Sequence, residues 1–545
     1  MRGRHASIDV STILRLYSIF GCCVVAFLLS LAFMAVTADA WPLVALFAAL
    51  VLVGIRDLTQ TRHALLRNYP VIGHVRYLVE GVRPELRQYL FENESDALPF
   101  SRTQRSLVYQ RAKSQADQRP FGTLLDVYSQ GYEFIGHSMR PLDHVDPANF
   151  RVRVGNDQCG QPYVASVLNI SAMSFGSLSA AAIRALNKGA KLGGFAHDTG
   201  EGSVSPYHEE FGGDLVWQIA SGYFGCRDAE GRFDPEKFAA RAASPQIRMI
   251  ELKLSQGAKP GHGGILPGHK VSAEIARVRG VPEGIDCISP ARHSSFETPA
   301  GMMRFLAELR RLSGGKPVGF KLAIGHPWEF MSIVKAMLAT GIVPDFIVVD
   351  GAEGGTGAAP VEFTDHVGVP MREGLLLVHN TLVGAGLRDR VRVGVSGKVI
   401  SAFDMASCFA LGADWVNAAR GFMFAIGCVQ SLSCHTNTCP TGVATQDRLR
   451  QRSLVVPDKA ERVAAFHAHT LSALAELLAA AGLDHPGRLA PHHLAQRVSP
   501  TEIRLLSQLH MFLKDGELLD PAARQGFYQT TWARAQAESF DPLPA

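Results

Sequence analysis

The sequence predicts an α/β protein built around a (β/α)₈ TIM barrel, preceded by a transmembrane helical hairpin and flanked by helical segments. Two apolar runs stand near the N-terminus. Between about residues 150 and 450, short apolar runs alternate with helix-like segments, and glycine-rich polar clusters follow most of these runs. Such alternation is typical of parallel strands with crossover helices, and about eight strands over roughly 300 residues fit a closed barrel. A doubly wound sheet is the alternative, because a sequence does not show whether a sheet closes.

Composition and charge argue against several classes of function. The chain has 545 residues, of which 47% are hydrophobic and 19% charged, and its net charge is +4. So small a net charge gives no argument for a nucleic-acid partner. Its nine cysteines are an odd number without a regular framework. This argues against a secreted disulfide protein and favours a reducing compartment.

The first part of the chain, residues 1–56, is predicted to be a transmembrane hairpin. Tyr17–Val36 is a run without a formal charge, long enough as a helix to match a hydrocarbon core of about 30 Å. A second, shorter run, Trp41–Ile55, needs Trp41 as an interfacial anchor. The alternative is a signal peptide, with Ala38-Asp39-Ala40 as its cleavage site.

Basic residues on both sides of the hairpin predict its orientation. Arg2, Arg4 and Arg15 precede the apolar runs, and the residues that follow them include Arg56, Arg62 and Arg67. Since arginine and lysine favour the cytoplasmic side, both ends of the hairpin are expected there. The catalytic part is therefore expected on the cytoplasmic face of the inner (cell) membrane.

Polar and helical segments flank the barrel. Residues 57–149 are predicted to be a connector or cap, with helices near Arg76–Tyr89 and Gln104–Gln118. Its arginines are suited to anionic lipid headgroups, although a solvated helical face is an equal alternative. Residues 451–545 are predicted to be a mostly helical extension, in which the helix Lys459–Ala481 ends at Gly482 and packs against the barrel.

The barrel itself is predicted over residues 150–450, and eight runs within it have strand character. These are Val164–Ala172, Phe195–Thr199, Met249–Leu254, Gly284–Ser289, Val318–Ile324, Asp345–Asp350, Val391–Ser396 and Trp415–Ala419. Helices are expected between them, for example over Ser179–Leu192, Glu329–Thr340 and Ala402–Leu411. Active sites of such barrels lie at the carboxyl ends of the strands.

Glycine-rich clusters stand where that active site is expected. They are Ser171–Ser177, His197–Gly202, Gln256–Gly264, Gly351–Gly357, Ser396–Lys398 and Ala419–Gly421. Backbone NH groups of the last two can hold a phosphate near strands seven and eight. Lys321, inside a strand, brings a cation that needs an anion or an electron-rich ring as partner. The glycines at 354–357 lack the spacing of a dinucleotide-binding fingerprint.

Three closely spaced cysteines, Cys428, Cys434 and Cys439, indicate a metal centre. Thiolates favour zinc, copper(I) or iron–sulfur clusters, and zinc would find a fourth ligand in His435. A proline directly after Cys439 is typical of iron–sulfur segments. The alternative is three buried thiols at the edge of a helix.

The segment from Cys434 to Gln446, CHTNTCPTGVATQ, resembles the iron–sulfur segment of glutamate synthases. Other stretches are similar to the FMN-binding central domain of that family: SAMSFGSLS, DTGEG, QGAKPGHGG with LPGHK, DGAEGGTGAAP and GLRDRVRV. The resemblance covers about Phe150 to Arg450 and points to a short, membrane-anchored subgroup. It implies that Cys428, Cys434 and Cys439 bind a [3Fe–4S] cluster.

The resemblance also implies roles for individual residues. FMN would sit over Ala172, Met173 and Ser174, with Lys321 near its ring. The residues implied on its phosphate side are Gly351, Gly355, Ser396, Gly397, Lys398, Arg420 and Gly421. Lys259 would be the lysine of the catalytic site, Glu201 an acidic partner and Arg279 the clamp on a dicarboxylate. The chemistry agrees, since a guanidinium binds a carboxylate in two places and a lysine can protonate a 2-oxo group.

The sequence departs from the family pattern at His262, where a glutamate is usual in PGEGG. This departure in the catalytic loop puts the substrate in doubt. We also expect neither a glutamine-hydrolysing domain nor the family's C-terminal β-helical domain. Ammonia would then be taken free or supplied by a separate protein, unless another amine is the nitrogen donor. The electron donor stays unassigned.

The expected reaction is reduction of an imine, formed from 2-oxoglutarate and ammonia, to L-glutamate, with reduced FMN as hydride donor and the cluster as its source of electrons. In a second hypothesis, the electrons flow in the opposite direction. A membrane-linked flavin dehydrogenase would oxidise an amino acid and pass electrons to a quinone or another carrier. A third is a non-catalytic redox sensor or scaffold that keeps the barrel.

Overall fold

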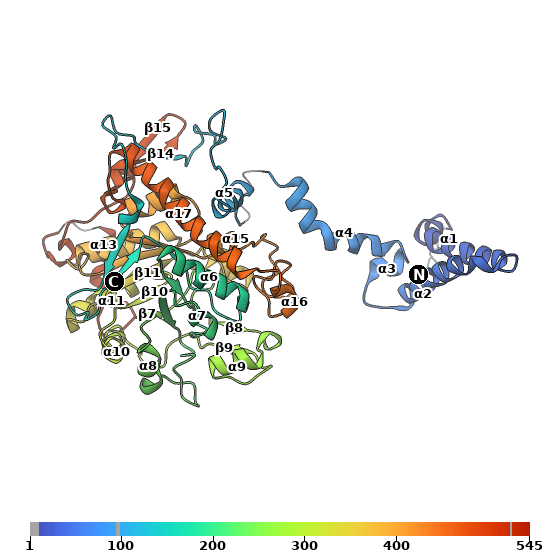
Figure 1. Cartoon of the computed structure of the whole chain (residues 1–545), viewed down its shortest axis with the longest axis horizontal. Coiled ribbons are helices and arrows are strands. Elements are labelled where there is room, and N and C mark those ends of the chain that lie inside the picture. The colour runs from blue at the N-terminus through green and yellow to red at the C-terminus, as the bar shows by residue number, and fades with distance from the viewer. Residues whose placement is uncertain (1–9, 94–98, 524–525, 545) are drawn as a thin grey trace, which may run out of the picture. The chain divides into compact units, whose positions relative to one another are not determined.

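The computed structural model describes residues 10–93, 99–523 and 526–544. Its contacts divide the chain into two compact units, Met1–Glu94 and Ser95–Ala545. Figure 1 labels the helices and strands of each unit. Arg2 and Arg4, on which part of the predicted orientation depends, lie outside the described residues.

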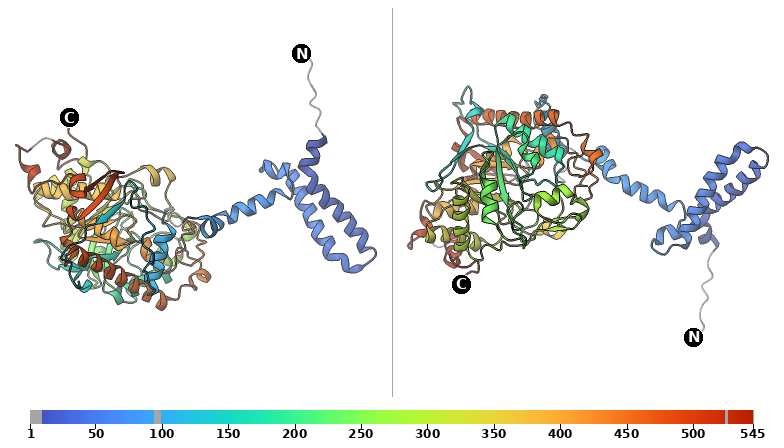
Figure 2. Two further views of the ribbon diagram at one scale, coloured as in Figure 1. Left: turned by 90° about the horizontal axis from the view of Figure 1, so that it is seen from above. Right: turned by 60° about the horizontal axis from the view of Figure 1, so that its bottom comes forward.

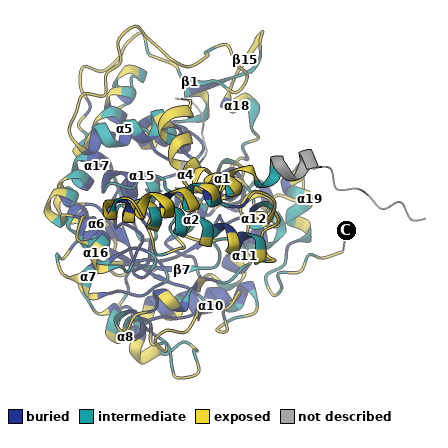
Figure 3. Cartoon of the chain, turned by 90° about the vertical axis from the view of Figure 1, so that its right-hand side faces the viewer, coloured by how far each residue is buried: buried dark blue, intermediate teal, exposed yellow. Residues whose placement is uncertain are grey.

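The first unit begins with the predicted helical hairpin. Helix α1 (Val10–Met34) and helix α2 (Trp41–Thr59) are joined by the 3-10 turn η1 (Ala38–Ala40) and pack against each other. The packing is close, because a Cβ at Gly54 would overlap the ring of Phe20. Most of their other residues are exposed or half-buried (Figure 3). By length and composition, both helices can cross a membrane.

Two further helices complete this unit. Helix α3 (Ala64–Asn68) leads into α4 (Gly73–Leu86), which continues as a π-helical turn, η2 (Arg87–Phe91). Asp57, near the end of α2, accepts hydrogen bonds from the backbone NH of Val71 (3.0 Å) and pairs with Nε2 of His74 (2.9 Å). These bonds hold the start of α4 beside the end of α2.

The second unit contains a closed barrel of eight parallel strands. In chain order they are β4 (Leu168–Ile170), β5 (His197–Asp198), β6 (Leu215–Ile219), β7 (Ile247–Lys253), β10 (Val318–Leu322), β11 (Phe346–Asp350), β12 (Arg392–Ser396) and β13 (Trp415–Ala418). The barrel closes where β13 pairs with β4, as in Val416 opposite Leu168. The predicted (β/α)₈ barrel is therefore confirmed, and the doubly wound alternative is excluded.

Helices surround the strands (Figure 1). The longer ones are α6 (Ala180–Gly193), α8 (Pro235–Ala242), α10 (Pro299–Leu312), α11 (Pro327–Thr340), α13 (Met371–Gly384) and α14 (Ala402–Ala410). Local sequence sets their ends: Ser179 caps α6 by accepting the NH of Ala182, and Gly194 ends it in the left-handed region. Their apolar faces cover the barrel and form one continuous core with it.

Two strand predictions differ from the structure. The predicted barrel strand 284–289 is wrong: only β9 (Cys287–Ile288) forms there, in a hairpin with β8 (Ile265–Leu266). Ile285 and Ile288 are exposed, so the apolar residues on which the strand prediction relied do not belong to the core. Strands β7 and β10 pair directly with each other, and the eighth barrel strand is instead β6, an unpredicted strand between β5 and β7. The predicted strand 164–172 is split, because β3 (Tyr163–Ser166) pairs outside the barrel with β2 (Arg151–Val154).

Segments before and after the barrel pack on it. Helix α5 (Arg102–Ala112) contacts α15 (Arg420–Ala425) and the long α17 (Val456–Ala481), which also lies along α6. The strands β1 (Glu133–Ile135), β14 (Leu494–Ser499) and β15 (Glu502–Leu505) form an antiparallel sheet, so the tail is not helical throughout. The remaining short helices are α7 (Pro206–Glu209), α9 (Ala273–Arg279), α12 (Val361–His366), α16 (Arg448–Gln451), α18 (Leu506–Leu509) and α19 (Phe527–Arg534).

Candidate active site

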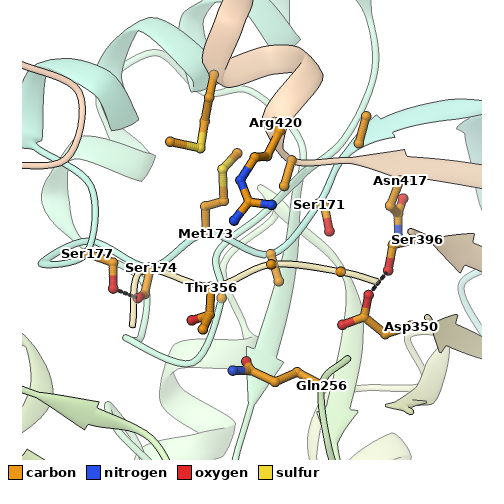
Figure 4. A pocket seen from close by; sticks show the side chains of 18 of the residues that line it. Ser171, Met173, Ser174, Ser177, Gln256, Asp350, Thr356, Ser396, Asn417 and Arg420 are labelled. Atoms are coloured by element: carbon orange, nitrogen blue, oxygen red, sulfur yellow. Dashed lines mark hydrogen bonds between the residues drawn. The ribbon is translucent and has the colours of Figure 1, made fainter. Parts of the chain in front are cut away.

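A pocket opens at the carboxyl ends of the barrel strands (Figure 4). Most of the predicted cofactor-binding residues line this pocket, and only two do not. Those in the wall are Ala172, Met173, Ser174, Lys321, Gly355, Ser396, Gly397, Lys398 and Arg420. The exceptions are Gly351, whose NH bonds the carbonyl of Ser396 (2.8 Å), and Gly421, which faces Phe466. The loops that the sequence analysis places at one end of the barrel therefore meet around one cavity.

One side of the pocket is built to hold an anion. Gly355 lies against Arg420 so closely that a Cβ there would overlap the guanidinium. On the neighbouring loop, Gly397 (φ 159°) and Lys398 (φ 52°) adopt positive φ, which turns this backbone sharply at the pocket wall. Glycine-lined backbone, a guanidinium and a lysine are groups that bind phosphate. This side fits the phosphate of a flavin mononucleotide.

Lys321, on β10, lines the pocket from the barrel interior and is buried. Its Nζ lies 3.4 Å from Asp350, whose carboxylate also accepts the hydroxyl of Ser396 (2.5 Å) and the NH of Gly257 (3.0 Å). Burial lowers the pKa of Lys321, but the charges of Asp350, Glu251 and Asp198 outweigh it, and the pKa is raised. Lys321 therefore remains a cation.

Two buried acids share this part of the barrel interior with Lys321. Burial raises the pKa of Asp198, and the charge of Glu251 raises it further. Burial likewise raises the pKa of Glu251, which accepts a hydrogen bond from the amide of Gln218 (2.6 Å). Both carboxyl groups therefore keep their protons to higher pH than free carboxylic acids do.

Glu201, predicted as an acidic partner in the catalytic site, forms an ion pair with Lys253. Nζ of Lys253 donates to Oε2 of Glu201 (2.6 Å) and to the side-chain oxygen of Gln256 (2.7 Å), and all three line the pocket. Burial raises the pKa of Glu201, but Lys253 outweighs it and lowers the pKa to about 2. Lys253 was not predicted as a site residue. It lies two positions after Glu251 in an apolar strand, and this spacing places both side chains on the same face, toward the barrel interior.

The other predicted catalytic residues are not among those that line the pocket. Lys259 is buried, and burial lowers its pKa while Glu201 opposes this. His262 bonds the carbonyl of Gly263 (2.8 Å). Arg279 donates to the carbonyl of Phe175 (3.0 Å), and its buried Nε has no hydrogen-bond partner among the described residues. Their predicted roles stay predictions.

The cysteine loop borders the same pocket, because Cys434 belongs to its wall. Burial raises the pKa of Cys439, but backbone NH groups of Ala444, Thr441 and Val443 outweigh it, and the pKa is lowered. NH groups aimed at a sulfur are typical of iron–sulfur ligands. Across the described residues, however, no three His, Cys, Asp or Glu side chains are placed to hold a metal ion.

The backbone of this loop is strained between Cys428 and Cys439. Gln430 (φ 57°), Leu432 (φ 58°) and Asn437 (φ 64°) lie in the left-handed region, which ordinary side chains disfavour. Such strain gathers at ligand-binding loops. Together with the NH groups around Cys439, it fits a loop that wraps a thiolate-bound cluster.

The family described as "Conserved region in glutamate synthase" matches residues 123–484. The chain belongs to the glutamate synthase family. It is 39% identical to the glutamate synthase large subunit-like protein YerD of Bacillus subtilis (strain 168), over 84% of this chain and 95% of that protein.

Other relatives are matched over a smaller part. The archaeal glutamate synthase [NADPH] of Methanocaldococcus jannaschii is 37% identical over 58% of this chain and 59% of its own length. Among solved structures, a mutant flavocytochrome b2 with pyruvate bound aligns with a TM-score of 0.40 at 13% identity, covering 83% of this chain and 91% of its own. So low a score adds nothing to what the closed barrel shows.

One part of the site precedes residues 123–484, which the family model matches. Phe100 is buried, lines the pocket and packs edge-on against Phe424. Its backbone NH and carbonyl both bond the side-chain amide of Gln430 (3.2 and 3.1 Å), and the hydroxyl of Tyr109 donates to the carbonyl of Cys428 (2.7 Å). We call Phe100 and Tyr109 with these contacts the α5 clamp; the sequence analysis does not predict it.

Proposed function

We propose that this oxidoreductase of the glutamate synthase family uses FMN and a [3Fe–4S] cluster to reduce the imine of 2-oxoglutarate and ammonia to L-glutamate. The observation that supports this best is one pocket bordered by the anion-binding loops, Lys321 and Cys434. When bound, FMN supplies hydride transfer and the cluster supplies single electrons. The protein supplies position, charge and protons.

The chain's own residues have distinct tasks in this proposal. Arg420 and the loops at Gly355 and Gly397 bind the cofactor phosphate. Lys321, kept cationic by Asp350, stabilises negative charge on an electron-rich ring beside it. Because this cation is buried and already paired, it needs little reorganisation when charge develops.

Protons for the substrate come from the group around Lys253. Its Nζ is oriented by Glu201 and Gln256, so a further N–H can point into the pocket and donate to a 2-oxo oxygen. Arg279 and Lys259 are proposed to bind the substrate carboxylates. For Arg279 this requires exchange of the Phe175 carbonyl for the substrate, and its unpaired Nε provides a second donor.

The surroundings of the reaction are part of the proposal. Helices α1 and α2 anchor the chain in the cell membrane, with the barrel on the cytoplasmic side. Ammonia enters free or from a separate protein. The hairpin also supports a second candidate, a membrane-linked flavin dehydrogenase that oxidises an amino acid and passes electrons to a quinone.

Anaerobic purification in detergent, followed by optical and electron paramagnetic resonance spectra, tests the cofactors. We expect flavin absorbance and a cluster signal after oxidation. Cys434→Ser should abolish the cluster signal and retain flavin, whereas Cys159→Ser, a half-buried cysteine outside the loop, should retain both. A colourless protein, or an unchanged signal in Cys434→Ser, would contradict the proposal.

The direction of reaction is tested on the same preparation. Chemically reduced enzyme should be reoxidised by 2-oxoglutarate with ¹⁵N-ammonium, and mass spectrometry should find ¹⁵N-glutamate. The dehydrogenase is instead supported if glutamate reduces the enzyme and a soluble quinone reoxidises it, with no ¹⁵N incorporated in the first experiment.

A further inference from the structure

Helix α4 carries an apolar face that its own unit leaves uncovered. Its apolar residues recur at helical spacing, which places them on one side: Val75, Leu78, Val79, Val82 and Leu86. All five are exposed, and Leu78 retains 68% of its surface. Exposed apolar side chains gathered on one face mark a contact surface.

Outside this face, α4 carries two arginines, Arg76 and Arg83, and two acids, Glu80 and Glu85. Arg76 pairs with Glu80 (2.9 Å), and Arg83 and Arg87 follow at helical spacing on that side. Several arginines in the short segment before α4 add to this charge, namely Arg56, Arg62 and Arg67. Over residues 56–91, six arginines outnumber three acids, Asp57, Glu80 and Glu85. An apolar helix face within such a segment suits the boundary of an anionic bilayer, where acyl chains and phosphate groups are neighbours.

The bonds of Asp57 fix where α4 begins. They tie Val71 and His74 to the last turns of α2, and the Asp57 side chain is only 3% exposed. Where α2 crosses a bilayer, its polar end at Asp57–Thr59 lies at the headgroups. The start of α4 is then held at the same level. Figure 2 shows α4 directed away from the axis of the α1–α2 hairpin in both views.

We propose that α4 lies in the plane of the membrane, on the Thr59 side of α2, with its apolar face at the acyl boundary and its arginines on anionic headgroups. This goes beyond the proposed reaction and is independent of it; it needs only that α1 and α2 span the bilayer. The occupant of the apolar face is lipid, because the Asp57 bonds hold the start of α4 beside the end of the apolar hairpin and arginines outnumber acids in this part of the chain.

Site-specific photocrosslinking tests the proposal on the full chain. A diazirine-bearing amino acid replaces Leu78 or Val82 on the apolar face, or Glu80 on the polar face as matched control. Leu28, exposed on α1, reports insertion of the hairpin. The chains are reconstituted in vesicles of phosphatidylethanolamine and phosphatidylglycerol, irradiated, and analysed by mass spectrometry for lipid adducts.

We expect lipid adducts at Leu28, Leu78 and Val82, in yields about tenfold above Glu80 because the polar face meets water. Exchanging phosphatidylglycerol for phosphatidylcholine should lower the yield at Leu78 and leave Leu28 unchanged, since only α4 depends on headgroup charge. Adducts at Leu78 with another part of this chain, or with a second copy, would overturn the proposal.

Two further outcomes would also overturn it. Equal yields at Leu78 and Glu80 would show that α4 has no lipid-facing side. Absence of adducts at Leu28 would show that the hairpin does not span the membrane. Nothing would then place α4 at the depth of the headgroups. None of these results depends on activity, so failure of the proposed reaction is detected separately.

Discussion

At the scale of single residues, the closest approach in the pocket joins Gly355 to Arg420. A methyl group at Gly355 would occupy the position of the guanidinium, whereas Gly357, two residues further along the same loop, has open space around its Cβ position. The two glycines lie in one loop, but their surroundings in space differ. The first is needed for close approach, and the second is not.

We therefore expect Gly355→Ala to displace Arg420 and to weaken FMN binding about tenfold, which corresponds to about 1.4 kcal/mol. Gly357→Ala should leave the affinity within about twofold, because its methyl group meets no atom. Titration of the flavin-free protein with FMN, followed by quenching of flavin fluorescence, measures both. Equal loss in the two variants would show that the loop, and not the Arg420 contact, determines affinity.

Charged residues inside strands show what the sequence reveals at this scale. Lys321 is recognisable because a lysine in a buried strand needs a partner, and the structure places it on the pocket wall. Lys253 and Asp350 are also charged residues in barrel strands and also need partners. The motif resemblance, however, points to Lys259, which lies in a loop. Which lysine pairs with Glu201 depends on side-chain directions that spacing along the chain does not contain.

At the scale of elements, the α5 clamp connects a helix before the conserved region to the cysteine loop. Tyr109 reaches the Cys428 carbonyl, Phe100 and Gln430 bond each other, and both aromatic rings pack on Phe424. The loop has little regular structure of its own and contains strained residues. Its position therefore depends on contacts of this kind.

Tyr109→Phe removes one hydrogen bond from the loop and keeps the ring. We expect a loss of about 1 kcal/mol locally, so that the loop opens about fivefold more often and the cluster signal decays correspondingly faster in air. Decay is followed by electron paramagnetic resonance. Tyr128→Phe, at an exposed tyrosine, is the control and should decay like the unaltered protein. Identical decay in Tyr109→Phe would contradict a positioning role.

The elements also show why some predictions succeed. Runs such as Val318–Ile324 and Val391–Ser396 consist of residues that favour strands, and strands β10 and β12 form there. Strand β6, LVWQI, also contains residues that favour strands, Val216, Trp217 and Ile219. It was not predicted, although it pairs with β5 and β7 in the barrel. The α5 clamp has no local signal, because its partners lie more than 300 residues away along the chain.

At the scale of the whole molecule, the second unit buries several histidines in their neutral form. Burial lowers the pKa of His197 and His467 to about 3, and that of His293 and His379 to about 4. For His293 and His379 the charges of Lys253 and Arg388 act in the same direction. Both ring nitrogens of His197 lack a hydrogen-bond partner in the described part of the chain.

These shifts predict loss of stability in mild acid. As pH falls below about 6.5, the unfolded chain takes up protons on its histidines. The folded chain does not do so until pH 3 to 4, so the unfolded state binds more protons and the free energy of unfolding falls with pH. Each such histidine contributes a slope of about 1.4 kcal/mol per pH unit. Asp198 and Glu251, with raised pKa values, oppose this, so a difference between variants is the appropriate measurement.

His197→Leu removes one of these groups and leaves the buried acids in place. Between pH 6 and pH 5, its free energy of unfolding should fall less steeply than that of the unaltered protein, by about 1.4 kcal/mol per pH unit. Denaturant unfolding in detergent, followed by fluorescence of the buried Trp217 and Trp415, measures this slope. Between pH 7.5 and 8.5 the curves should run parallel, because His197 is neutral in both states. Curves that stay parallel down to pH 5 would mean that His197 is protonated in the folded barrel, which requires a buried anion or water beside it.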